Sequence, residues 1–157
     1  MRLEIYFLVA ILGLYHQSDN NLVMHSTEEL MAVDAEFSDY SSKYGRNKAF
    51  IQYCHEEGVM LVQDAMPIAG KSSVTDWLMQ RTDSSYMLTW EPTHASCASS
   101  GELGYTFGIW TMRDKQLEKD EPAQQGTYVT IWRKNDRGEW RFVLDSGNSG
   151  LKERPSE

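Results

Sequence analysis

Two pairs of a carboxylate and a tyrosine are the side chains of this sequence best suited to chemistry. One pair is Asp145 with Tyr128, and the other is Asp34 with Tyr40. A carboxylate in an apolar cavity gains proton affinity and can act as a general base, while a phenol can donate a hydrogen bond to a developing oxyanion. For each residue singly a structural role is the preferred interpretation. Asp145 would fix the chain at Ser146–Asn148, and Asp34 would lie on a helix surface or bond to neighbouring backbone. The catalytic candidates are Asp145, Tyr128 and Asp34.

The last third of the chain is expected to position the first pair, because it has the alternating pattern of long antiparallel strands. Aromatic residues alternate with other residues in Leu103–Trp110 and in Tyr128–Trp132. If Ser100–Gly101 is a two-residue hairpin loop, Ser96 faces Tyr105 across the strand pair. The other face of this hairpin then carries small residues, which leave room for a closely packed helix or for a ligand.

A second hairpin is expected between Tyr128 and Asp145. If Lys134 pairs with Glu139, Tyr128 faces Asp145 on a face that mixes aromatic and polar groups. The opposite face carries the apolar residues expected to form the core: Val129, Ile131, Trp140, Phe142 and Leu144. A three-residue loop with Gly138 in a bulge would shift the register by one residue and separate Tyr128 from Asp145.

Three helices are expected before these strands. The first begins at the capping box Ser26–Glu29 and ends at Gly45, with apolar residues spaced by threes and fours between them. The second begins at Asn47, and the third begins at Ser73. Helices followed by an antiparallel sheet are typical of an α+β fold, in which the helices pack against the sheet.

The N-terminus has the pattern of an export signal. Arg2 precedes an apolar run from Ile5 to Tyr15, and polar residues follow this run. We expect residues 1–18 to direct export to the periplasm or the extracellular space, with cleavage near Ser18; without a signal the protein would be cytoplasmic. The run is too short for a stable membrane span. At the other end, residues 148–157 are expected to form a flexible tail.

The composition indicates one folded domain. The 157 residues are 41% hydrophobic, which suffices for one core and is small for two domains. The formal net charge of -8 leaves no basic stripe for a phosphate backbone, so nucleic acid is not an expected partner. Cys54, in an expected helix, and Cys97, in an expected strand, are interpreted as buried thiols, with one disulfide left open for an exported chain.

No metal site is expected in this sequence. His94 and Cys97 are three residues apart, and in a strand an odd separation places two side chains on opposite faces. Tryptophans offer another binding chemistry, because their rings can stack on a sugar or a polycyclic ligand, although buried tryptophans in a small sheet domain usually belong to the core. The five are Trp77, Trp90, Trp110, Trp132 and Trp140.

Several short motifs share a family pattern. They are Asp34-x-x-Phe37, Pro67-x-x-Gly70, Trp90-Glu91-Pro92, Gly101-Glu102-Leu103-Gly104-Tyr105-Thr106-x-Gly108-x-Trp110, Gly126-x-Tyr128-x-Thr130-x-Trp132, and Gly138-x-Trp140 leading to Asp145. On these motifs the chain resembles the nuclear transport factor 2-like superfamily, and within it the SnoaL-like and ketosteroid-isomerase-like domains of unassigned function, from Ser26 to Gly147.

The resemblance implies a domain over residues 26–147 with the shape of a cone-shaped roll. Three N-terminal helices would pack on a strongly curved antiparallel sheet around a pocket, and the outer surface of the sheet would often form a homodimer. The resemblance does not select a function, because the superfamily includes ketosteroid isomerase, polyketide cyclases and scytalone dehydratase as well as non-catalytic domains.

Two main functions follow as hypotheses, and neither needs a cofactor. The first is a domain that binds a small apolar or aromatic ligand without covalent chemistry. Its expected ligand-binding residues are Tyr40, Trp90, Tyr105, Tyr128, Thr130, Trp132 and Asp145. The second is an isomerase, cyclase or dehydratase that acts on a hydrophobic carbonyl compound with a buried carboxylate as base. A third interpretation, a subunit that mainly dimerises, predicts that replacing Arg133 or Trp110 dissociates it.

Overall fold

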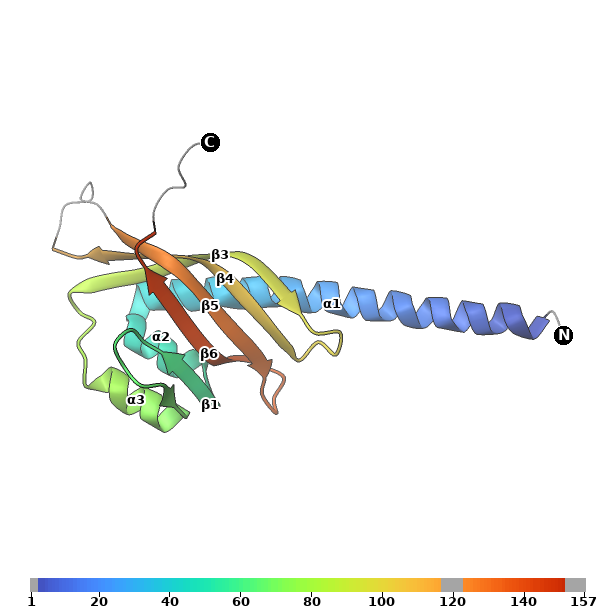
Figure 1. Ribbon diagram of the computed structural model, residues 1–157, viewed down its shortest axis with the longest axis horizontal. Helices are drawn as coiled ribbons and strands as arrows, with labels where there is room; N and C mark the ends of the chain where they lie inside the picture. The colour runs from blue at the N-terminus through green and yellow to red at the C-terminus, as the bar shows by residue number, and fades with distance from the viewer. Residues whose placement is uncertain (1–2, 117–122, 152–157) are drawn as a thin grey trace, which may run out of the picture.

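The fold is described from a computed structural model (Figure 1). The structure describes the backbone of residues 3–116 and 123–151, and the side chains of residues 24–116 and 123–151. Its elements are α1 (Leu3–Tyr44), α2 (Arg46–Tyr53), β1 (Cys54–Leu61), β2 (Ile68–Ala69), α3 (Lys71–Met79), β3 (Tyr86–Cys97), β4 (Leu103–Asp114), β5 (Gln124–Lys134) and β6 (Trp140–Ser149).

Helix α1 is a single long helix that continues without a break through Ser26. The helix start expected at Ser26 is therefore wrong. Ser26 is 1% exposed and belongs, with Asp34, Ser38 and Ser41, to a buried polar row of this helix. The expected end of the helix is confirmed, because Gly45 follows Tyr44 with a φ of 95°, a conformation that glycine adopts without strain.

The N-terminal part of α1 extends beyond the sheet in Figure 1. Residues 1–2 lie outside the described residues, and the backbone of residues 3–18 belongs to α1, so the export signal stays a prediction. In the part of the chain that the structure describes, no helix has the length and apolar character required to cross a bilayer.

The six strands form one open sheet in the order β2-β1-β6-β5-β4-β3. All neighbouring pairs are antiparallel except β1 and β6, which are parallel. The sheet is therefore mixed and not wholly antiparallel as expected, because β1 and β6 are connected through α3 and four further strands and not through a hairpin. The expected α+β fold, with three helices packed on a curved sheet, is confirmed (Figure 1).

The hairpin of β3 and β4 has the predicted register, with Ser96 opposite Tyr105. Its small-residue face packs against helix α1. A Cβ atom on Gly104 would lie 2.8 Å from Leu30 Cδ2, so the glycine allows the helix to approach the sheet closely. The space left by these small residues is therefore filled by a helix.

The hairpin of β5 and β6 departs from the predicted register. Lys134 pairs with Trp140 rather than Glu139, and the register shifts once more between Ile131 and Trp132. Tyr128 consequently pairs with Gly147 and not with Asp145. The turn explains the first shift, because the Asn135 side chain accepts hydrogen bonds from two backbone N–H groups of the turn and Gly138 has a φ of 76°.

The second register shift changes which side chains form the core. Trp140 and Phe142 are buried on the same inner face as Tyr128, Thr130 and Trp132. The expectation that Val129, Ile131 and Leu144 form the core with them is wrong, because these three lie on the outer face. Phe37 of α1 is the centre of the core, with ring centroids 4.5 Å from Trp90 and 4.9 Å from Phe50.

The ends of the elements also differ in two places from expectation. Strand β6 includes Asn148 and Ser149, so the expected tail at 148–157 begins too early; residues 152–157 lie outside the described residues. Cys54 begins strand β1 rather than lying in a helix. Both cysteines are free thiols, and burial raises the pKa of Cys54 to about 11.

Candidate ligand-binding site

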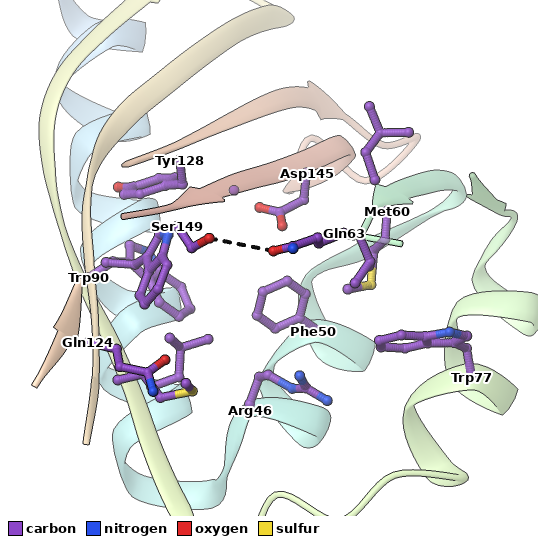
Figure 2. A pocket seen from close by; sticks show the side chains of 16 residues that line it. Arg46, Phe50, Met60, Gln63, Trp77, Trp90, Gln124, Tyr128, Asp145 and Ser149 are labelled. Atoms are coloured by element: carbon purple, nitrogen blue, oxygen red, sulfur yellow. Dashed lines mark hydrogen bonds between the residues drawn. The ribbon is translucent and has the colours of Figure 1, made fainter. Parts of the chain in front are cut away.

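A cavity of about 340 Å³ lies between the inner face of the sheet and helices α2 and α3 (Figure 2). Its walls are mainly apolar and include three tryptophans. The lining residues are Arg46, Phe50, Met60, Leu61, Val62, Gln63, Trp77, Leu88, Trp90, Trp110, Met112, Gln124, Tyr128, Asp145, Gly147 and Ser149. A concave apolar space of this size with a few polar groups is typical of a small-molecule site.

Asp145 is the one carboxylate among the described residues that line this cavity. Figure 2 shows its carboxylate directed into the space. Thr130 Oγ1 donates a hydrogen bond to Asp145 Oδ2 at 2.8 Å. Burial raises the pKa of Asp145 to about 7, since the hydrogen bond from Thr130 lowers the pKa by less and the nearby charge of Asp34 raises it. A carboxyl with this pKa accepts or donates a hydrogen bond near neutral pH.

Asp145 reaches the inner face because of two irregularities in the β5–β6 hairpin. The turn shifts the register by one residue, and Val143 is an extra residue between the pairs Trp132–Phe142 and Ile131–Leu144. Because side chains alternate with a period of two, the two shifts together restore the original face. Asp145 therefore lies opposite Thr130 and on the same face as Tyr128.

Asp34 lies behind the cavity wall, fully buried between α1 and the sheet. Trp90 Nε1 donates to Asp34 Oδ1 at 2.8 Å, and the Tyr128 hydroxyl donates to Asp34 Oδ2 at 2.7 Å. Burial raises the pKa of Asp34, while hydrogen bonds from Tyr128, Thr106 and Trp90 oppose this rise. Asp34 is thus neither paired with Tyr40 nor on the helix surface, and the hydrogen bonds of its carboxylate come from side chains, including those of Trp90 and Tyr128, rather than from neighbouring backbone.

The phenol of Tyr128 belongs to this buried cluster. Its pKa is raised because burial and the charge of Asp34 both disfavour the phenolate. Figure 2 shows that the ring borders the cavity while the hydroxyl points away from Asp145. The proton of this hydroxyl is thus used in the bond to Asp34 and does not point at the cavity.

Arg46 lies across the cavity from Asp145, with the Phe50 ring between them in Figure 2. Its Nε and Nη2 atoms donate to Asn47 Oδ1 at 3.1 and 2.8 Å. The guanidinium also lies over the rings of Trp77 and Tyr86, at 5.9 and 5.6 Å from their centroids. The cavity therefore has an acidic group and a basic group on opposite sides of an apolar middle.

The structure places the seven expected ligand-binding residues in three groups. Trp90, Tyr128 and Asp145 line the cavity. Thr130 does not line it, but its hydroxyl donates a hydrogen bond to Asp145. Trp132 is fully buried and donates to Thr106 Oγ1 at 2.9 Å, so it belongs to the core.

The other two residues of that set lie away from the cavity. Tyr40 packs beside Tyr44, with ring centroids 4.5 Å apart. Tyr105 is 41% exposed on the outer face of the sheet, because odd-numbered positions of β4 point outward. The structure therefore does not bring Tyr40 and Tyr105 into one pocket with Trp90.

Several residues of the cavity did not follow from sequence reasoning. Trp77 and Trp110 were identified only as rings able to stack on a ligand, and both line the cavity. Arg46, Phe50 and Met60 had no signal of their own, since they meet the other lining residues only in the folded chain. Among the described residues, no three His, Cys, Asp or Glu side chains are grouped closely enough to hold a metal ion.

Solved structures with similar folds provide the comparison with known proteins. A ketosteroid isomerase-like protein from Erwinia carotovora atroseptica is 12% identical with a TM-score of 0.60, over 78% of this chain and 95% of that one. A nuclear transport factor 2-like protein with a cystatin-like fold from Novosphingobium aromaticivorans is 14% identical with a TM-score of 0.61, over 89% and 86% of the two chains.

A nuclear transport factor 2-like superfamily protein from Salmonella enterica is 14% identical with a TM-score of 0.62, over 82% of this chain and 94% of that one. Neither the protein-family models nor the curated proteins give a match to this sequence. At these identities the similarity shows the fold and not the activity. The chain thus has the nuclear transport factor 2-like fold, also described as cystatin-like.

Proposed function

We propose that this protein binds a small, mainly apolar or aromatic molecule in the cavity and does no covalent chemistry on it. The observation that carries this proposal is the carboxylate of Asp145, which opens into an apolar cavity of about 340 Å³. Burying a carboxylate in an apolar cavity costs stability. A ligand group that hydrogen-bonds to Asp145 would explain why a carboxylate lies there.

The arrangement of Tyr128 favours binding over catalysis. Enolisation of a carbonyl compound needs a base and a hydrogen-bond donor that stabilises the oxyanion. Asp145 has the position of a base, but the hydroxyl of Tyr128 donates to Asp34 at 2.7 Å, on the far side of the cavity wall. The described lining residues thus include a possible base, Asp145. The phenol that the sequence suggested as the hydrogen-bond donor, Tyr128, donates to Asp34 instead.

The alternative function is an isomerase- or lyase-type enzyme that acts on a hydrophobic carbonyl compound without a cofactor. One observation favours it, namely the pKa of about 7 for Asp145, which suits a general base at neutral pH. The similarity of fold to a ketosteroid isomerase-like protein is compatible with this chemistry.

Binding is tested with the neutral aromatic probe 2-naphthylacetamide, measured by isothermal titration calorimetry. Ser149 lines the cavity, whereas Asn148 beside it points to the outer face. Ser149→Trp should fill the cavity and weaken binding by about tenfold or more, while Asn148→Trp should change it by less than about twofold. Equal affinities for the two variants, or no binding to the wild type, would contradict the proposal.

Catalysis is tested with 2-tetralone in D₂O. The binding proposal expects deuterium exchange beside the carbonyl group to proceed at the rate of the buffer alone. Exchange that is accelerated by the wild type and abolished in Asp145→Asn would favour the enzyme. Mass spectrometry of small molecules that co-purify with the folded protein would then identify the ligand class directly.

We also propose that two copies associate through the outer face of the sheet. The apolar outer-face patch consists of five side chains that are 37–42% exposed: Leu103, Tyr105, Phe107, Ile109 and Val129. These residues lie on the adjacent strands β4 and β5 and on the face away from the helices. A contiguous apolar patch of this kind is more often an interface than a free surface.

Export through residues 1–18 is likewise a proposal. The apolar run from Ile5 to Tyr15, flanked by Arg2 and by polar residues, supports it. Sequencing the N-terminus of the protein from its native host tests it, with a chain that begins near Asp19 as the expected result. A chain that keeps its first residues would show that the segment is not removed.

A further inference from the structure

The basic side of the cavity has a cation whose charge is not neutralised by an ion pair. Arg46 lines the cavity, and its Nη1 atom has no hydrogen-bond partner among the described residues. The nearby carboxylate of Asp83 accepts a hydrogen bond from the Asn47 N–H at 2.8 Å. Within the described part of the chain, the ion pairs that form do not include Arg46.

The guanidinium is held in place by a buried side chain. Asn47 accepts from Arg46 through its Oδ1, and its Nδ2 donates to the carbonyl oxygens of Leu78 and Arg81 at 2.9 and 2.7 Å. Asn47 therefore connects Arg46 to the end of α3. A guanidinium that is fixed before binding loses little conformational freedom when it binds a ligand.

Aromatic rings provide the remaining contacts of this cation. Arg46 lies over Trp77, and Trp77 also carries Arg81 on its ring, with the Arg81 guanidinium 3.8 Å from the ring centroid. Two guanidinium groups thus lie close to one wall of the cavity. These two cations lie beside the cavity of a chain whose formal net charge is -8.

We propose that the ligand of this cavity is an aromatic or apolar molecule with one carboxylate, and that the carboxylate binds Arg46. This inference rests on the proposed binding function and adds the charge and orientation of the ligand. Arginine presents donors in the planar arrangement that a carboxylate accepts, and an apolar surrounding strengthens such a bond. The apolar body then lies beside Phe50 and Trp77, and the opposite end of the ligand faces Asp145.

The experiment compares two probes of nearly equal shape, 2-naphthylacetate and its neutral amide 2-naphthylacetamide, by isothermal titration calorimetry at pH 7. The wild type should bind the acid about tenfold more tightly than the amide. Arg46→Met should remove this preference, so that the variant binds the acid and the amide with affinities within about twofold of each other. Arg46→Lys, which keeps the charge without the planar fork, should keep part of the preference.

Arg137→Met is the matched control, because it removes the same charge from an exposed turn of the β5–β6 hairpin. It should keep the preference for the acid, which separates a local contact from the overall charge. An equal affinity for both probes in the wild type, or a preference that survives Arg46→Met, would overturn the inference while leaving the binding function intact. Failure of both probes to bind would overturn both.

Discussion

The most informative single residue is Asp145, because its position is costly for the fold. Its carboxylate lies in an apolar cavity, and Thr130 is the hydrogen-bond partner that the described structure gives it. Burial favours the protonated form and raises the pKa from its ordinary value of 3.8 to about 7. A residue that weakens the folded state at neutral pH is expected where function requires it.

Replacing Asp145 with Asn is expected to stabilise the protein at high pH. The native state binds a proton between pH 3.8 and about 7 that the unfolded state does not, so stability falls as the pH rises through this window. The substituted amide would carry no charge, and its oxygen would still accept a hydrogen bond from Thr130. We expect the free energy of unfolding of the Asp145→Asn variant to exceed that of the wild type by about 1–3 kcal/mol at pH 8. Near pH 4 the two should be almost equal, as measured by urea denaturation.

The control for this measurement is Asp136→Asn in the exposed turn, which should shift stability by less than about 0.5 kcal/mol at every pH. If Asp145→Asn were less stable than the wild type throughout this range, the ionised carboxylate would be a stabilising group. The interpretation of Asp145 as a costly functional residue would then be wrong.

Tyr128→Phe tests the buried cluster behind the cavity. The change removes the hydroxyl that donates to Asp34 Oδ2 at 2.7 Å and leaves a fully buried carboxyl with one donor fewer. We expect a loss of about 1.5–3 kcal/mol in the free energy of unfolding, as for other hydrogen bonds to a buried charged group. Tyr105→Phe removes the same atom from an exposed side chain and should cost less than about 0.5 kcal/mol. Equal effects of the two changes would refute a specific bond to Asp34.

At the scale of elements, close approach between strands determines the shape of the inner face. A Cβ atom on Gly108 of β4 would lie 2.0 Å from the Glu91 carbonyl oxygen of β3 and 2.9 Å from Tyr128 Cε1. Neither neighbour is the free end of a flexible side chain. The strand pair therefore requires a residue without a side chain at this position.

Gly108→Ala is expected to destabilise the protein by more than about 2 kcal/mol, because the strands must separate or the Tyr128 ring must move. Gly147→Ala in β6 is the matched comparison, since its added Cβ would be 3.4 Å from Trp110 Nε1 and 3.6 Å from a backbone oxygen, which is tolerable contact. The free energy of unfolding of the Gly147→Ala variant should lie within about 1 kcal/mol of the wild-type value. Thermal unfolding of both variants decides between a local steric effect and a general loss of glycine flexibility.

The elements also show what sequence patterns can predict. The register of β3 and β4 followed from a short loop, and the end of α1 followed from Gly45, because both depend on local residues. The parallel pairing of β1 with β6 did not follow, since it joins residues about 85 positions apart, such as Val59 and Leu144. The extra residue at Val143 had no local signal either, because valine is an ordinary strand residue.

The candidate site shows the same limit. The pair Tyr128 and Asp145 was placed on one face, and this is correct, but the predicted direct pairing was wrong by two residues. Asp34 was identified as a candidate from its residue type, but its partners could not be, because Trp90 and Tyr128 lie 56 and 94 residues away in the chain. Periodicity identifies a face, whereas partners across elements depend on the packing of the whole domain.

At the scale of the whole molecule, the two faces of the sheet differ in what they contact. The inner face covers the core and the cavity, and the outer face carries the apolar patch of β4 and β5. Trp110 is on the inner face and lines the cavity, so its replacement would test ligand binding rather than association. The prediction that replacing Trp110 dissociates a dimer stays a prediction, and the place of Trp110 in the cavity does not support it.

Phe107→Glu is expected to convert a dimer of this protein to a monomer. Phe107 is 42% exposed near the middle of the outer-face patch, and the ring of His94 packs beside it at 5.5 Å. A carboxylate buried there in both copies lacks an opposite charge and would cost about 3–5 kcal/mol per interface, which corresponds to at least about a hundredfold weaker association. Sedimentation equilibrium of both proteins at several concentrations measures this change, with circular dichroism to show that the fold is kept.

The control is Met79→Glu, which places the same charge on another exposed apolar residue. Met79 is 70% exposed at the end of α3, away from the outer face of the sheet, so this variant should sediment as the wild type does. A wild type that is monomeric at all concentrations would contradict the proposed association. A dimer that survives Phe107→Glu would place the contact between copies on another surface, and the exposed patch of β4 and β5 would then require a different partner.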